Sequence, residues 1–170
     1  MYTTFMDMLV KLIADGMMLP IVVLALYAFL TKIPRADRYQ RYVTIFMAGI
    51  TSYVAAKFIG ALWQPETLRP FQKLGVDPGA AYLNNPGFPS DHALFAAFLT
   101  FAVWYASRSR VLTGAMIAMT ILVCLGRVLA LVHTPLDVVG GIAVAAFGAL
   151  WYLPDMKQVS AKLLAKKSNK

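Results

Sequence analysis

The sequence predicts an all-α integral membrane protein, a bundle of about five transmembrane helices with an extracytoplasmic active-site loop. Of its 170 residues, 59% are hydrophobic and only 14% are charged, whereas a soluble domain carries about 25% charged residues. Five apolar segments are near the roughly 17–25 residues that a helix needs to cross the bilayer. No internal repeat divides the chain, so we expect residues 1–170 to form one membrane-embedded domain with a basic C-terminal tail at about 155–170.

The five expected spans follow one another along the chain, interrupted by one long loop. The spans are residues 9–31, 42–63, 91–107, 111–131 and 134–153. The loop runs from Gln64 to Ser90 and contains Pro65, Pro70, Pro78, Pro86 and Pro89. Long loops of this kind are usually functional or disordered.

Two of the spans begin with recognisable helix starts. Ser90 suits the N-cap of the third span, and residues 134–137 (Thr-Pro-Leu-Asp) resemble a capping arrangement for the fifth. On the fifth span, Gly141, Ala145 and Gly148 form a face of small residues. Such a face permits close packing against a neighbouring helix.

Lysine and arginine are concentrated at one end of the expected bundle. They gather in the first connection, the third connection and the C-terminal tail, as Lys32, Arg35, Arg38, Arg41, Arg108, Arg110, Lys157, Lys162, Lys166, Lys167 and Lys170. With five spans, these segments lie on one side of the membrane, and cytoplasmic segments are the ones enriched in Lys and Arg. We therefore expect the C-terminus in the cytoplasm, and the N-terminus and the long loop outside.

The composition argues against nucleic acid and metal as partners. A net charge of +8 would suggest nucleic-acid binding in a soluble protein, but here the cations flank apolar segments, where they set topology. Cys124 lies alone in an apolar span, without the Cys and His neighbours of a metal site. The sequence also has no carboxylate cluster of the kind that holds Mg²⁺. We expect no metal and no cofactor.

Chemically active residues gather at the expected outer ends of the spans. They are Arg69, Ser90, Asp91, His92, Arg127, His133 and Asp137, and they include both histidines of the chain. Taken singly, Ser90 and Asp137 are explained as helix caps and the arginines as interfacial anchors. Taken together, two helix N-termini, two guanidinium groups and two imidazoles make a concentrated site for a phosphate-like anion.

The spacing of these residues is specific. Arg127 is followed after five residues by His133 and after three more by Asp137, with Pro89-Ser90-x-His92 and Arg69-Pro70 upstream. This order resembles the signature of the type 2 phosphatidic acid phosphatase superfamily: Lys-x6-Arg-Pro, Pro-Ser-Gly-His, and Ser-Arg-x5-His-x3-Asp. The match covers about residues 57–141. The Pro-Ser-Asp-His variant, the small size and the string VHTPLDVVGG look most like bacterial undecaprenyl-diphosphate phosphatases. That resemblance implies the bacterial cytoplasmic membrane, with the site facing outward.

The chain departs from the family pattern at several positions. Leu62 stands where the family has its lysine, and Lys57 lies twelve residues before Arg69. If the helix runs to Trp63, Lys57 lies about 9 Å below the outer end of that helix and can reach upward only in part. Lys73, in the long loop, is another candidate for the missing cation. Asp91 replaces a glycine and Gly126 replaces a serine. The family core commonly has six spans, whereas this sequence predicts five.

The resemblance implies a role for each site residue. His133 would attack phosphorus to form a phosphohistidine, Asp137 would hold its other ring nitrogen, and His92 would protonate the leaving group and then activate water. Arg69, Arg127 and Ser90 would bind the phosphate oxygens. Asp91 is the exception: the resemblance gives it no role, and we expect it to cap the third helix or, as the alternative, to orient His92.

The resemblance also implies a membrane lipid phosphate as substrate. Undecaprenyl diphosphate is favoured, and phosphatidate, phosphatidylglycerophosphate and a lipid A phosphate are the alternatives. The missing motif lysine also raises another class, a non-catalytic lipid-phosphate binding or transport protein. Against that class, binding alone does not need both histidines and Asp137. The sequence gives no expectation for the oligomeric state.

Overall fold

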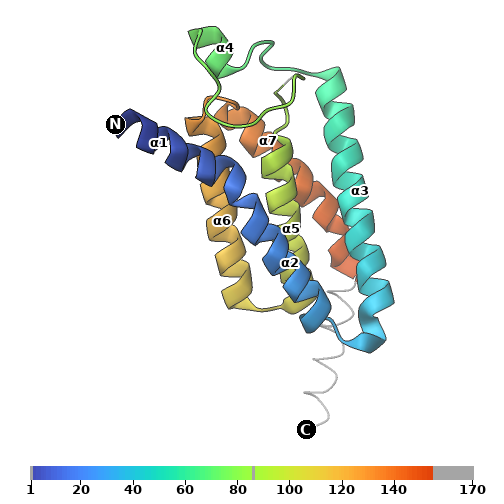
Figure 1. The fold of residues 1–170 in the computed structure, drawn as a ribbon. Coiled ribbons are helices and arrows are strands. Elements are labelled where there is room, and N and C mark those ends of the chain that lie inside the picture. Colours follow the sequence, from blue (N-terminus) through green and yellow to red (C-terminus); the bar gives the residue numbers. More distant parts are fainter. Residues whose placement is uncertain (1, 86, 155–170) are drawn as a thin grey trace.

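The computed structural model describes residues 2–85 and 87–154, which form helices and loops without a strand among them. In chain order the elements are α1 (Tyr2–Lys11), a π-helical turn (Leu12–Gly16), α2 (Met18–Lys32), a 3₁₀ turn (Arg35–Asp37), α3 (Arg38–Leu62), α4 (Pro70–Leu74), α5 (Asp91–Ser107), α6 (Arg110–Leu129), α7 (Pro135–Gly148) and a 3₁₀ turn (Ala149–Tyr152). The all-α fold class is confirmed (Figure 1). The expected basic tail, about 155–170, lies outside the described residues.

Within residues 2–85 and 87–154, four helical stretches are long and apolar enough to cross a membrane. They are Phe5–Lys32, Arg35–Leu62, Arg110–Leu129 and Pro135–Tyr152. The first is already helical before the expected start at residue 9, because an apolar run does not mark where a helix begins. The expected third span is α5, whose 17 residues extend for about 25 Å.

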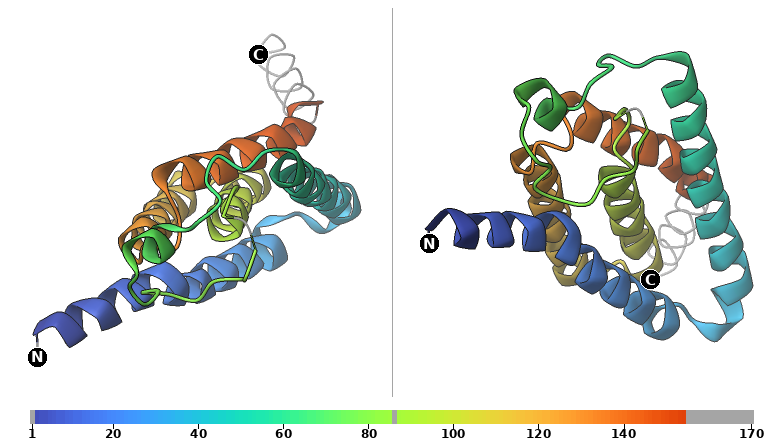
Figure 2. Two further views of the ribbon diagram at one scale, coloured as in Figure 1. Left: turned by 90° about the horizontal axis from the view of Figure 1, so that it is seen from above. Right: turned by 45° about the horizontal axis from the view of Figure 1, so that its top comes forward.

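Helix α5 is the centre of the bundle. It packs against α2, α6 and α7 and more lightly against α3, and the view from the loop end shows these helices around it (Figure 2). Alanines at positions 93, 96, 97, 102 and 106 are among its buried residues. Their small side chains let the surrounding helices approach closely. The N-terminus of α5, with Asp91 and His92, is therefore held at a fixed place among its neighbours.

The small-residue face of α7 is where this helix meets its neighbours. A Cβ atom at Gly148 would lie 2.0 Å from the Ser52 Oγ on α3, and one at Gly141 would lie 2.6 Å from the Ser90 carbonyl oxygen before α5. The expectation of close packing is confirmed. A backbone hydrogen bond from Ser90 N to Asp137 O (2.9 Å) joins the starts of α5 and α7 directly.

The long loop crosses the ends of the central helices and includes the short helix α4 (Figure 1). Backbone hydrogen bonds attach it to the α6–α7 connection: Phe71 N donates to Leu131 O and Gly79 N to Ala130 O, each at 3.0 Å. Gln64 binds both backbone groups of Phe88, which fixes the two ends of the loop to each other. The loop thus covers the N-terminal ends of α5 and α7.

Candidate active site

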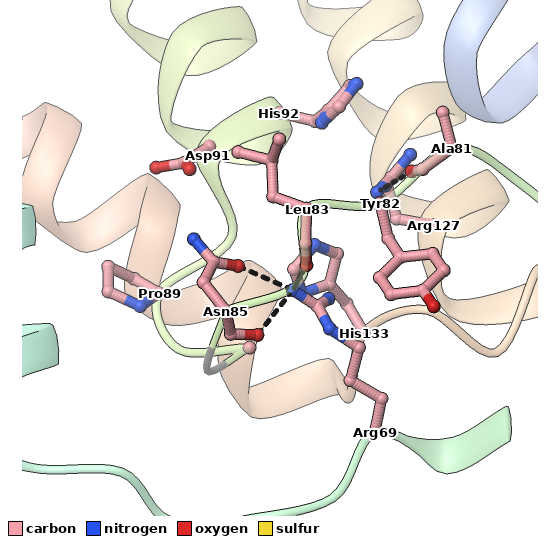
Figure 3. A pocket seen from close by; sticks show the side chains of 11 residues that line it. Arg69, Ala81, Tyr82, Leu83, Asn85, Pro89, Asp91, His92, Arg127 and His133 are labelled. Carbon is pink, nitrogen blue, oxygen red and sulfur yellow. Dashed lines mark hydrogen bonds between the residues drawn. The ribbon is translucent and has the colours of Figure 1, made fainter. Parts of the chain in front are cut away.

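A cavity of about 150 Å³ lies beneath this loop, at the start of α5 and the end of α6 and beside the turn that precedes α7 (Figure 3). Its lining residues are Arg69, Ala81, Tyr82, Leu83, Asn85, Gly87, Pro89, Asp91, His92, Arg127 and His133. Five of the expected site residues are therefore brought together at one cavity. Ser90 and Asp137 are buried next to it, and Lys57 lies at its edge through a contact with Asp91.

His133 lies in the turn between α6 and α7 and is 5% exposed. Its Nδ1 atom is 3.5 Å from Asp137 Oδ2, without an aligned hydrogen bond between them. The same Oδ2 accepts a hydrogen bond from Thr134 N at 2.8 Å, and Thr134 Oγ1 accepts one from Asp137 N at 3.2 Å. The capping arrangement expected at residues 134–137 is confirmed, and it fixes the Asp137 carboxylate in front of His133.

The surroundings of His133 favour a neutral ring. Burial lowers the pKa of His133, Asp137 raises it in part, and the positive charges of Arg127 and Arg69 lower it further. The pKa is thus held below its usual value of about 6.5. A neutral imidazole with its proton on Nδ1, facing Asp137, carries its lone pair on Nε2.

Arg69 is 7% exposed and is held by the loop. Its Nη1 donates to Val132 O at 2.6 Å, while its Nη2 donates to Leu83 O and to the backbone and side-chain oxygens of Asn85 at 3.0–3.2 Å. Its backbone N–H binds Gln72 and so starts α4 in a capping box. Burial lowers the pKa of Arg69, but a guanidinium stays charged at neutral pH. Asn85 could not be expected from the sequence as a site residue, since an exposed loop amide carries no distinctive pattern.

Arg127 is 1% exposed, on the last turn of α6. Its Nη1 donates to Asp15 Oδ1 and its Nη2 to Ala81 O, each at 2.7 Å. Asp15 Oδ2 in turn accepts a hydrogen bond from Ala81 N at 2.9 Å, and Asp15 Oδ1 lies 3.9 Å from Nε2 of His92. Asp15 was missed from the sequence as a site residue. The signal that could have found it is a carboxylate inside the apolar run of the first span.

Ser90 is the N-cap of α5, as expected. Its side chain is fully buried, and its hydroxyl oxygen accepts a hydrogen bond from Ala93 N at 3.5 Å. Asp91 is not the cap but the first residue of the helix. The expectation that Asp91 caps α5 was therefore wrong, because Ser90 already occupies that position.

Asp91 instead binds Lys57, which reaches it from α3. The Lys57 Nζ atom is 2.8 Å and 3.0 Å from the two carboxylate oxygens. From its position along α3, Lys57 is expected below the site, but its ammonium group lies at the edge of the cavity. Lys73, the other candidate cation, pairs with Glu66 among exposed residues of the loop.

Comparison with known proteins identifies the family. A model of the PAP2 superfamily matches residues 38–160. Neither a curated protein nor a solved structure matches the chain. The matched region holds both histidines, Asp137 and both buried arginines, in the order of the signature described above. The chain therefore belongs to the PAP2 superfamily of phosphatases.

Proposed function

We propose that the protein hydrolyses a lipid phosphate or diphosphate at the outer face of the cytoplasmic membrane, through a phosphohistidine intermediate and without a metal. Undecaprenyl diphosphate is the favoured substrate, giving undecaprenyl phosphate and phosphate. The observation that carries the proposal is the single cavity lined by His92, His133, Arg69 and Arg127, with Asp137 against His133.

In the first step, Nε2 of His133 attacks phosphorus while the bond to the leaving oxygen breaks. His92 donates a proton to that oxygen, and Asp137 stabilises the positive ring that forms at His133. Arg69 and Arg127 stabilise the negative charge on the equatorial oxygens, and their own hydrogen bonds to the backbone of the loop hold both guanidinium groups in place.

In the second step, His92 removes a proton from water, and the hydroxide attacks the phosphorus bound to His133. The phosphorus–nitrogen bond breaks, phosphate leaves, and His133 is neutral again. The lowered pKa of His133 supports its return to the neutral form at the end of each cycle.

A lipid substrate is supported by an apolar groove whose lining includes Leu94, about one helical turn along α5 from Asp91 of the cavity. The groove has a volume of about 570 Å³ and lies over α5 between α2 and α3, which diverge toward the loop end (Figure 2). On α5 its walls include Leu94, Phe95 and Phe98, and on α3 they include Tyr53 and Val54. These residues are one to two turns along their helices from Asp91 and Lys57. A substrate with its phosphate in the cavity can therefore lay an apolar chain in the groove.

The outward orientation is supported by the separation of charges along the bundle. The α2–α3 and α5–α6 connections, which carry the basic residues expected in the cytoplasm, lie at the opposite end from the cavity (Figure 1). By the positive-inside rule that end faces the cytoplasm, which leaves the cavity outside.

The proposal is tested by phosphate release from purified protein in detergent, with undecaprenyl diphosphate, phosphatidate and phosphatidylglycerophosphate compared. Wild type should release phosphate and form an acid-labile, base-stable phosphoprotein, and His133→Ala should do neither. Binding of these lipids without release by wild type would instead indicate the non-catalytic class. Faster hydrolysis of phosphatidate than of undecaprenyl diphosphate would replace the favoured substrate.

A further inference from the structure

The N-terminal helices contribute a charged side chain that binds two residues of the cavity lining, from outside the family match. Asp15 lies in the π-helical turn Leu12–Gly16, between α1 and α2, whereas the match starts at residue 38. Its two carboxylate oxygens bind Arg127 and the backbone of Ala81, and both of these residues line the cavity. Asp15 is thus connected to two separate parts of the cavity wall.

Close approach of this turn to α6 depends on Gly126. A Cβ atom at position 126 would lie 2.7 Å from Ala14 N and 2.8 Å from Ala14 Cα. Real Cβ atoms do not approach backbone atoms so closely, so any other residue at position 126 would displace the turn that carries Asp15. Ala14 itself is fully buried against α6. The replacement of the family's serine by Gly126 therefore has a structural consequence here.

The π-helical turn determines where the carboxylate points. A π turn inserts an extra residue into a helix and so rotates the side chains that follow, and such turns are frequent at functional sites. Here Asp15 lies in the turn, with its carboxylate against Arg127 and 24% of its side chain exposed. A carboxylate inside an apolar helix is costly unless it has a partner, and Arg127 supplies that partner.

Asp15, Arg127 and Ala81 form a closed set of three hydrogen bonds. Arg127 donates to Asp15 and to Ala81 O, and Ala81 N donates to Asp15. The set fixes the plane of a guanidinium that is 1% exposed. The Nε–H group of Arg127 is left buried without a partner among the described residues. A buried donor of this kind on a cavity-lining side chain is free to bind an oxygen atom of a ligand.

We infer that Asp15 is a positioning residue for phosphoryl transfer, acting through Arg127. It balances the charge of the guanidinium, holds it in the orientation in which Nε–H remains free for a phosphate oxygen, and ties the Ala81 segment to it. The inference rests on the proposed function, since it concerns how the same site stabilises charge at phosphorus. Asp15 does not touch the substrate itself.

The test is a double-mutant cycle on phosphate release, with wild type, Asp15→Asn, Arg127→Ala and the double variant. Asp15→Asn keeps the size of the side chain but removes its charge, so the guanidinium loses its fixed orientation. A misplacement of about 1 Å can cost roughly 100-fold, so we expect kcat to fall about 10- to 100-fold, with a smaller change in KM. In the Arg127→Ala background the same substitution should change kcat less than about threefold, because the group it positions is gone.

The matched control is Asp7→Asn, an exposed carboxylate in α1, which should keep wild-type kinetics. If Asp15→Asn does not fold, as judged by its melting temperature in detergent, the cycle is measured with Asp15→Glu, and the same non-additivity is expected. The inference is overturned if Asp15→Asn is folded and as active as wild type, or if the loss in either Asp15 variant multiplies with that of Arg127→Ala. Absence of phosphate release by wild type would instead refute the proposed function.

Discussion

Replacement of Lys57 should affect substrate binding far more than stability. The Lys57 Nζ and Asp91 Oδ1 atoms are 2.8 Å apart, and the two side chains are 44% and 38% exposed. Exposed ion pairs contribute only about 0–1 kcal/mol to stability, so Lys57→Ala should nearly retain the melting temperature of the wild type. The substitution does, however, leave the Asp91 carboxylate without its cation at the wall of a cavity that we propose binds phosphate.

The size of the effect follows from the dimensions of the cavity. A sphere of about 150 Å³ has a radius of about 3 Å, which puts a carboxylate at its wall roughly 5–8 Å from a bound phosphorus. At an effective dielectric constant of about 40, the repulsion is about 1–2 kcal/mol per unit of phosphate charge. A change of that size corresponds to a KM about 5- to 30-fold higher.

The assay is the initial rate of phosphate release in detergent micelles at a series of substrate mole fractions. Lys57→Ala should raise KM with a smaller change in kcat, and adding Asp91→Asn should recover most of the loss because the repelling charge is gone. High salt should narrow the difference from wild type, since the pair is exposed. The reasoning is refuted if Lys57→Ala lowers kcat as much as Arg127→Ala does, or if Asp91→Asn restores nothing. Either result would mean that Lys57 contacts the phosphate itself.

Three further predictions concern the proposed mechanism and topology. His92→Ala should slow turnover by about 10²- to 10⁴-fold. The loss should be smaller for undecaprenyl diphosphate than for phosphatidate, because a phosphate monoester leaves more easily than an alkoxide. Equal losses on the two substrates would count against His92 as the acid. Because burial lowers the pKa of His133, single-turnover phosphoprotein formation should persist below pH 6.5 and fall only as pH drops through that lowered pKa. If the amount of phosphoprotein already declines above pH 7 as the pH is lowered, the nucleophile is not neutral and the prediction is contradicted. A cysteine at Gly79 should be labelled from outside and a reporter after Lys170 should be cytoplasmic, and a cytoplasmic Gly79 would reverse the proposed substrate side.

The helices and their caps could be predicted because their signals are local. The apolar run that gives α5 and the Thr134–Asp137 capping arrangement of α7 depend only on residues close in sequence. His92, Arg127 and His133 could be grouped for a similar reason, because they lie where apolar runs begin or end and such ends must meet at a membrane surface. Signals of this kind do not depend on how the helices are arranged around one another.

Contacts between helices that are far apart in sequence could not be predicted in this way. A rise of 1.5 Å per residue puts Lys57 about 9 Å below the end of α3. That value is a distance along α3 alone and does not give the distance from Lys57 to the site. In the structure, α5 begins lower in the bundle than the loop end of α3 (Figure 1). Asp91, at the start of α5, therefore lies at the same height as Lys57 and binds it. The height of one helix against another depends on packing, which no local pattern records.

Two departures from the family pattern are each matched by a contact in the structure. Where the family has a neutral glycine, this chain has Asp91, and the added negative charge is paired with Lys57, which lies outside the motif position. Where the family has a serine, this chain has Gly126, and the space it leaves is occupied by the turn that carries Asp15. A substitution beside a charged cavity is tolerated when its charge or volume is balanced nearby. The motif departures therefore indicate where this chain uses residues of its own, from α3 and from the N-terminal helices, to complete the charge balance around the cavity.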